Sequence, residues 1–179
     1  MKQDENLKIA VFDAGHSLEQ RHCPIDGEKV KSCISCKTCA IMNGFGGAGA
    51  FSDGKYNITN DFGGTLYEYI GRQKALELMK YVDTINMSHG GEGTKMYSTA
   101  GTDLKKVCLQ NKLKLLDASV RHLGTDVNYV VLKNLYDEMK EHMDFFFDTP
   151  VEKIQVKEDG YTVSAKDAEY ACRKCIVSV

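Results

Sequence analysis

The sequence predicts an α/β domain that also carries an antiparallel β-meander. Three observations indicate this class: an unbroken apolar run near the N-terminus, amphipathic segments with a helical period in the middle, and alternating segments around an Asp-Gly pair near the C-terminus. Unbroken apolar runs are typical of strands in parallel sheets, whereas alternation indicates strands with one solvated face. At 179 residues the chain is long enough for one domain with a sizeable core.

The first expected element is a strand over Leu7–Asp13, because its central residues are all apolar. From His16 to Asn60 the sequence shows neither a helical nor an alternating pattern. This segment holds four cysteines and then a glycine-dense stretch, Gly44–Lys55. It is far longer than the usual connection in a compact domain, so we expect it to be functional or mobile.

A helix is expected to begin at Thr65, because Thr65 and Glu68 have the spacing of a capping box. Its apolar residues follow a 3.6-residue period to Ile85, and the glycines after His89 end it. The remaining expected elements are a short helix from Thr102 or Asp103 to about Asn111, a strand over Lys112–Leu123, a helix from Thr125 or Asp126 whose apolar stripe reaches Met139, and strands over Phe145–Phe147, Val151–Val156, Tyr161–Ala165, Glu169–Cys172 and Cys175–Val179.

Composition excludes several functional classes. Hydrophobic residues make up 42% and charged residues 27%, with a net charge of −2, which excludes a disordered chain and a strongly basic nucleic-acid binder. No apolar run approaches the roughly 18 residues that span a bilayer, and Met1–Asn6 is too polar for a signal peptide. Seven cysteines without an export signal indicate a reducing compartment. We expect a cytoplasmic protein with no nucleic-acid or membrane partner.

Two phosphate-binding motifs overlap in the glycine stretch. Gly44–Gly49 matches G-x-G-x-x-G, and Gly49–Lys55 matches G-x-x-x-x-G-K. Neither lies between an expected strand and an expected helix, and Tyr56 replaces the Ser or Thr that binds magnesium in a P-loop. Small residues beside Phe45 and Phe51 instead indicate backbone that packs closely against a large, flat group.

One loop holds four cysteines: Cys23, Cys33, Cys36 and Cys39. Four thiolates suit a tetrahedral zinc ion, and a C-x2-C-x2-C run also begins the bacterial ferredoxin signature. The fourth position of that signature is Asn43, so a zinc site, an iron–sulfur cluster and free or redox-active thiols all remain open. We expect Cys108, Cys172 and Cys175 to be structural.

Three stretches, Lys8–Asp13, Glu19–Pro24 and Gly44–Lys55, together resemble the FAD-dependent dehydrogenases, also called NAD(P)/FAD-dependent oxidoreductases, most of which have no assigned substrate. His122–Asp126 and Thr149–Ile154 are similar in place and type, so the resemblance covers most of the chain. It implies a partial FAD-binding, Rossmann-like domain of the two-dinucleotide-binding-domain flavoproteins, with an antiparallel β-meander and a helical insertion. Its parts would be the strand and cofactor loop over 7–64, the helical segment over 65–143 and the meander over 144–179. In addition, the segment 54–60 resembles the G-R-C-N-x-T-N stretch of a broader flavoprotein group.

The resemblance also implies roles for individual residues. Asp13 would hold the adenosine ribose, Arg21 would lie near the adenine or the phosphates, and the backbone of Val151 would pair with the adenine edge. The pyrophosphate and flavin would be wrapped by Gly46, Gly47, Ala48, Gly49, Ala50, Phe51, Ser52, Asp53, Gly54 and Lys55. Such a protein would move hydride through FAD, with NAD(P)H as a candidate electron donor. The resemblance identifies no catalytic residue and no substrate.

In the family pattern a strand, a G-x-G-x-x-G turn and a helix precede the equivalent of Leu7, and a glycine turn and a substrate half follow Cys175–Val179. The sequence lacks these parts, so we expect an interior fragment of a longer chain. The missing strands would leave sheet edges exposed, and exposed edges favour self-association. The alternative functions are a metal or iron–sulfur module on the loop cysteines, a nucleotide hydrolase built on Gly49–Lys55, and a non-catalytic remnant.

Overall fold

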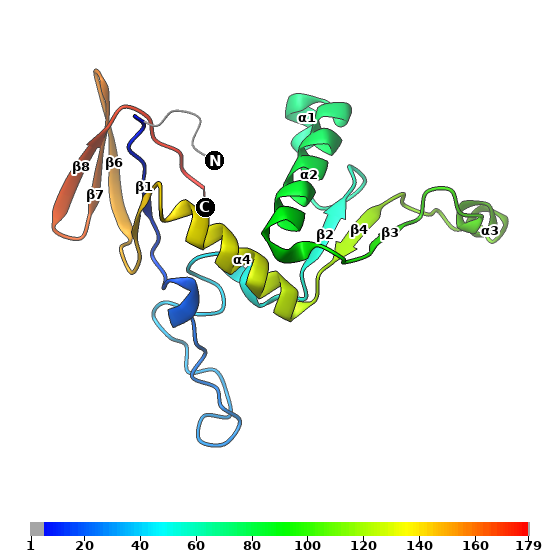
Figure 1. Ribbon diagram of the computed structural model, residues 1–179, viewed down its shortest axis with the longest axis horizontal. Coiled ribbons are helices and arrows are strands. Elements are labelled where there is room, and N and C mark those ends of the chain that lie inside the picture. Colours follow the sequence, from blue (N-terminus) through cyan, green and yellow to red (C-terminus); the bar gives the residue numbers. More distant parts are fainter. Residues whose placement is uncertain (1–5, 179) are drawn as a thin grey trace. The chain divides into compact units, whose positions relative to one another are not determined.

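The computed structural model describes residues 6–178, which form a mixed α/β chain with four α-helices and several small sheets (Figure 1). The chain divides into two compact units. Unit 1 contains the described residues up to Ala48 together with those from Tyr136, and unit 2 contains Gly49–Leu135. The boundary therefore falls inside the glycine stretch and, at its other end, inside a helix.

Unit 1 contains two sheets. Strand β1 (Ala10–Phe12) pairs in parallel with β5 (Asp144–Phe146), which confirms the expected parallel pairing of the first strand. The expected meander is also present, because β6 (Val151–Lys157), β7 (Gly160–Ala165) and β8 (Ala168–Cys172) pair antiparallel in that order. The strand near the N-terminus is shorter than expected, and Ala10 is exposed, so this strand is not covered on both faces.

The hairpin between β6 and β7 turns at Glu158 and Asp159, because Lys157 pairs with Gly160. Gly160 has a φ of +149°, and a Cβ at this position would collide with the carbonyl oxygen of Cys172 in β8. The glycine of the Asp-Gly pair thus serves both the turn and the close approach of the third strand.

Aromatic side chains form the core around β1 and β5. On one face the ring of Phe12 stacks on Phe146 with centroids 4.9 Å apart, and Tyr170 of β8 contacts both rings. Neighbouring residues of a strand point to opposite faces, so Phe145 and Phe147, on either side of Phe146, belong to a second aromatic group. This second group comprises Phe45, Tyr136, Phe145 and Phe147. The two sheets and the glycine loop of unit 1 are therefore joined by ring contacts.

Unit 2 is built on a three-stranded antiparallel sheet in the order β2 (Lys55–Ile58), β4 (Ser119–His122) and β3 (Met96–Ser98). The sequence predicted neither β2 nor β3, and placed β2 inside an irregular loop. Each of these strands has at most four residues, too few for a clear alternation, and the pairing partner of both is distant in the chain. Only the C-terminal part of the expected strand over Lys112–Leu123 is a strand.

The long helix expected from Thr65 is two helices, α1 (Leu66–Ile70) and α2 (Arg72–Asn86). Gly71 lies between them with a φ of +84°, a value that interrupts any right-handed helix. The expected capping box is not formed, since the Thr65 side chain makes no capping hydrogen bond.

The two later helices are confirmed as α3 (Leu104–Gln110) and α4 (Thr125–Met139). The expected strand over Cys175–Val179 is wrong for its described part, because residues 175–178 pair with no strand and Ile176 is 93% exposed. Val179 itself lies outside the described residues.

Candidate functional site

Asp13 lies at the carboxyl end of the parallel pair β1–β5 in unit 1. Its N–H donates to the carbonyl oxygen of Phe146 at 3.0 Å, and its own carbonyl oxygen accepts the N–H of Thr149 at 2.9 Å. One carboxylate oxygen, Oδ1, accepts the N–H of Gly15 at 2.8 Å. The half-buried carboxylate is therefore fixed at the carboxyl end of this strand pair.

The glycine loop is tied to the same edge. The N–H of Phe45 donates to the carbonyl oxygen of His16 at 3.1 Å. A Cβ on Gly15 would collide with the backbone of Gly44, and a Cβ on Gly44, whose φ is +106°, would collide with His16. Both positions require glycine because two backbones meet there.

Arg21 holds this loop from inside. Its side chain is 2% exposed, and its Nε donates to the carbonyl oxygen of Ala40 at 2.8 Å. Nη2 donates to the carbonyl oxygen of Ile41 at 2.7 Å, and Nη1 donates to that of Phe45 at 2.6 Å and that of Gly44 at 3.4 Å. The guanidinium thus donates to buried carbonyl oxygens, and leaving these without a hydrogen bond would destabilise the fold.

Burial lowers the pKa of Arg21, and electrostatic interactions with Asp13 and then Cys39 oppose that shift. An arginine remains charged under either influence. The structure therefore places a permanent positive charge close to the Asp13 carboxylate and to the last cysteine of the loop.

A histidine–carboxylate pair lies at the same edge, and the sequence did not indicate it. His16 Nδ1 is 2.5 Å from Asp148 Oδ1, and the N–H of Asp148 donates to the carbonyl oxygen of Gly15 at 2.9 Å. Both side chains are partly exposed, at 38% and 48%. No local pattern could have joined two residues so far apart in the chain.

After the contacts between the glycine loop and His16, the backbone at Gly46 and Gly47 has positive φ values of +81° and +57°. The N–H of Gly47 donates to the carbonyl oxygen of Gly44 at 2.8 Å. A Cβ on Gly47 would meet nothing within 4 Å, so open space lies beside the loop there. The backbone at Gly47 is therefore accessible from this side.

In unit 2 the loop is held by Asn128 of α4, which is 1% exposed. Its Nδ2 donates to the carbonyl oxygen of Gly49 at 2.9 Å, and its Oδ1 accepts the hydroxyl of Tyr56 at 2.9 Å. Gly54 has a φ of +62°, and a Cβ there would crowd Asn128 and Leu123. Burial raises the pKa of Tyr56, so its hydroxyl stays protonated as a donor to Asn128.

Asp53 forms an ion pair with Lys55 at 2.6 Å, and His122 Nε2 is 3.7 Å from the same carboxylate. The hydrogen bond from Lys55 is the main reason why the pKa of Asp53 is lowered. All three side chains are largely exposed, and they place an anionic and two basic groups at the start of β2.

The residues expected to bind the cofactor are divided between the units. Unit 1 contains Asp13, Arg21, Gly46, Gly47, Ala48 and Val151. Unit 2 contains Gly49, Ala50, Phe51, Ser52, Asp53, Gly54 and Lys55. Val151 begins the edge strand β6 and is 41% exposed. Most of the loop residues are exposed, whereas Ala50 and Gly54 are buried.

The seven cysteines are free thiols, and Cys23, Cys33 and Cys36 are exposed. The N–H of Ser35 donates to the Sγ of Cys33 at 3.4 Å. Across residues 6–178, no three His, Cys, Asp or Glu side chains are gathered closely enough to hold a metal ion.

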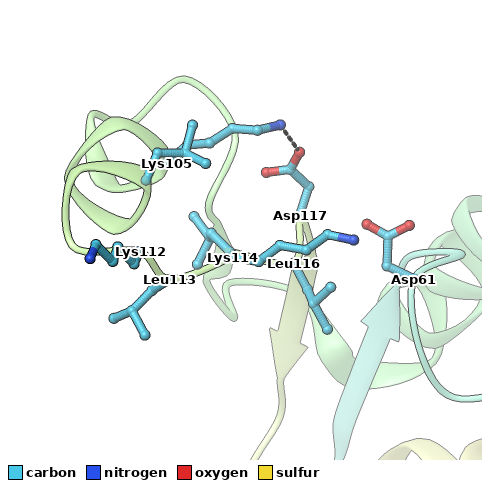
Figure 2. A pocket seen from close by; sticks show the side chains of 9 residues that line it. Asp61, Lys105, Lys112, Leu113, Lys114, Leu116 and Asp117 are labelled. Atoms are coloured by element: carbon cyan, nitrogen blue, oxygen red, sulfur yellow. Dashed lines mark hydrogen bonds and ion pairs between the residues drawn. The ribbon is translucent and has the colours of Figure 1, made fainter.

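Unit 2 also has a depression lined by α3, by residues 112–117 that lead into β4, and by Asp61 (Figure 2). Lysines and leucines dominate its lining, and Lys105 donates to Asp117 at 2.9 Å. None of the residues expected to bind a cofactor lies in this lining.

Comparison with known proteins yields no matching family model, no similar curated protein and no similar solved structure. None of the helices in the described range has the length and apolar character needed to cross a bilayer.

Proposed function

We propose that this chain is part of an FAD-dependent oxidoreductase, with a Rossmann-like arrangement at the β1–β5 edge. The observation that carries the proposal is a glycine loop joined to the carboxyl end of a parallel strand pair beside a fixed carboxylate. Phe45 and Gly44 meet His16 and Gly15 there, next to Asp13. Dinucleotides bind at such edges because carboxyl ends of parallel strands leave a crevice lined by backbone N–H groups.

In this proposal Asp13 accepts hydrogen bonds from the ribose hydroxyls. Gly46, Gly47 and Ala48 lie beside the pyrophosphate, where the absence of large side chains permits close approach. Val151, on an edge strand, offers its outward backbone to the adenine. Arg21 is a positioning residue, since its nitrogens hold loop carbonyls.

The loop residues of unit 2, Gly49–Lys55, are proposed to lie against the flavin. Asn128 fixes the start of this stretch through the carbonyl oxygen of Gly49. FAD, when bound, accepts and returns hydride equivalents, and NAD(P)H is the proposed electron donor. We place this activity in the cytoplasm because seven free thiols suit a reducing compartment.

Titration of the purified chain with FAD, followed by flavin fluorescence, tests the proposal. We expect saturable binding that weakens about 10- to 100-fold in Asp13→Ala, because a hydrogen bond to a charged group is worth about 1.5–3 kcal/mol. Asp144→Ala is the matched control, since Asp144 is an exposed carboxylate at the opposite end of the same strand pair. No saturable binding, or equal loss in both variants, would contradict the proposal.

A further inference from the structure

The loop with the four cysteines is closed at its base. Arg21 precedes Cys23 by two residues, and the carbonyls that Arg21 binds at 2.8 and 2.7 Å belong to Ala40 and Ile41, directly after Cys39. The Arg21 side chain therefore joins the two ends of the loop, close in sequence to Cys23 and Cys39. Between them, residues 22–39 form no helix or strand, and Figure 1 shows this blue segment as a long irregular excursion.

The backbone between the middle pair of cysteines contains a left-handed residue. Ser35, two residues after Cys33, has a φ of +54°, and its N–H points to the Sγ of Cys33 at 3.4 Å. The left-handed residue therefore lets the chain turn between Cys33 and Cys36.

The charge of the loop favours an anionic centre. Between residues 21 and 39 the sequence has four permanently cationic side chains and two acidic ones, a net charge of +2. These six are Arg21, Lys29, Lys31, Lys37, Asp26 and Glu28. One zinc ion with four thiolates has a charge of −2, so the loop and the centre would neutralise one another. Free thiols have no such need for surrounding cations.

We propose that Cys23, Cys33, Cys36 and Cys39 bind one zinc ion as a four-thiolate structural site. Zinc is preferred to an iron–sulfur cluster because the residue at the fourth ferredoxin position is Asn43. Each thiol releases its proton to solvent as its sulfur bonds to the metal, and no electron is transferred. The four sulfurs are separate in the described structure, so zinc binding includes closure of the loop over the ion. The zinc proposal does not require FAD to bind.

The experiment uses the full chain with Cys108, Cys172 and Cys175 all replaced by Ser, so that only the four loop thiols remain. Zinc is added to one equivalent at neutral pH without FAD, and the metal environment is measured by X-ray absorption. We expect one tightly bound ion with four sulfur neighbours at about 2.3 Å. A shell dominated by oxygen or nitrogen, or no retained zinc, would overturn the proposal.

A second measurement identifies the ligands within the loop. In the same background, Cys36→Ser should lower zinc affinity by at least tenfold and reduce the sulfur count to three. Ser32→Ala is the matched control, because it alters a neighbouring loop residue without removing a thiol. Unchanged affinity and sulfur count in Cys36→Ser would overturn the assignment. FAD binding by the same protein is a separate readout, so the zinc and flavin proposals can fail independently.

Discussion

At the scale of single residues, buried polar groups organise both units. Arg21 binds loop carbonyls in unit 1, and Asn128 joins a loop carbonyl to the Tyr56 hydroxyl in unit 2. Each side chain is at most 2% exposed, so each group needs its partners. The sequence identified Arg21 as a site residue only through the family resemblance. It could not reveal what the guanidinium contacts, because the acceptors are backbone atoms of a loop without periodicity.

Asp26 provides a pH prediction at this scale. Its Oδ1 accepts the N–H groups of Glu28, Lys29 and Val30 at 2.8–2.9 Å, and these bonds, above all that of Val30, lower the pKa of Asp26 below its ordinary value of 3.8. The carboxylate therefore stabilises the turn above pH 3.8, and this contribution is lost as the pH falls through the lowered pKa.

Carboxyl-carbon NMR of the Asp26 side chain measures this shift directly. The amide signals of residues 28–30 should move with the same midpoint, because they report the same hydrogen bonds. In Asp26→Asn, which has no carboxylate at this position, the amide signals of residues 28–30 should show no such midpoint. If Asp26 titrates at or above 3.8, its carboxylate does not accept these three hydrogen bonds in solution.

At the scale of elements, α2 is joined to β4 by a nearly buried ion pair. Arg121 of β4 donates from Nε and Nη2 to the two carboxylate oxygens of Asp83 at 3.0 and 2.8 Å, and from Nη1 to the carbonyl oxygen of Thr94 at 2.6 Å. The two side chains are only 14% and 11% exposed. The hydrogen bonds that Arg121 donates to Asp83 raise the pKa of Arg121, so the guanidinium stays charged.

We predict that Asp83→Asn lowers the free energy of unfolding by about 3 kcal/mol, because it leaves the Arg121 guanidinium without its charged partner in a poorly solvated place. Urea denaturation measures the loss. Glu77→Gln is the control on the same helix, since Glu77 is exposed and its carboxylate accepts a hydrogen bond from the Gln73 side chain at 2.8 Å. It should change stability by less than about 0.5 kcal/mol. Equal effects would show that α2 is not held through Asp83.

The elements differ in how far the sequence could predict them. The β6–β7 hairpin was predicted because its turn and its alternation are local in the chain. The short strands β2 and β3 were missed because their partner in each case is β4, which lies far along the sequence. Similarly, the pairing of His16 with Asp148 depends on the β1–β5 pairing, which no local period can report.

At the scale of the whole molecule, the sheets are small and their edges are numerous. The parallel sheet has two strands and each antiparallel sheet has three, so most strands in the described range have an unpaired side. A two-stranded sheet is marginal in water, and an open edge can pair with another chain. The sequence predicted self-association through such edges, and this stays a prediction.

Strand β6 is the edge at which this prediction can be tested. It has seven residues and pairs only with β7, and its Val156 is 78% exposed. Val156→Lys places a charge on the edge, and edge lysines oppose pairing with a second strand. Ile176→Lys is the matched control: it exchanges an apolar side chain that is 93% exposed for the same charge, but outside any strand.

Sedimentation equilibrium over a range of concentrations distinguishes edge pairing from general apolar contact. If β6 pairs with another chain, Val156→Lys should weaken association by about tenfold, equivalent to about 1.4 kcal/mol, while Ile176→Lys leaves it nearly unchanged. If exposed apolar surface alone drives association, the two variants should weaken it alike, because each removes one apolar side chain and adds one charge. A monomer at every concentration would contradict association by either route.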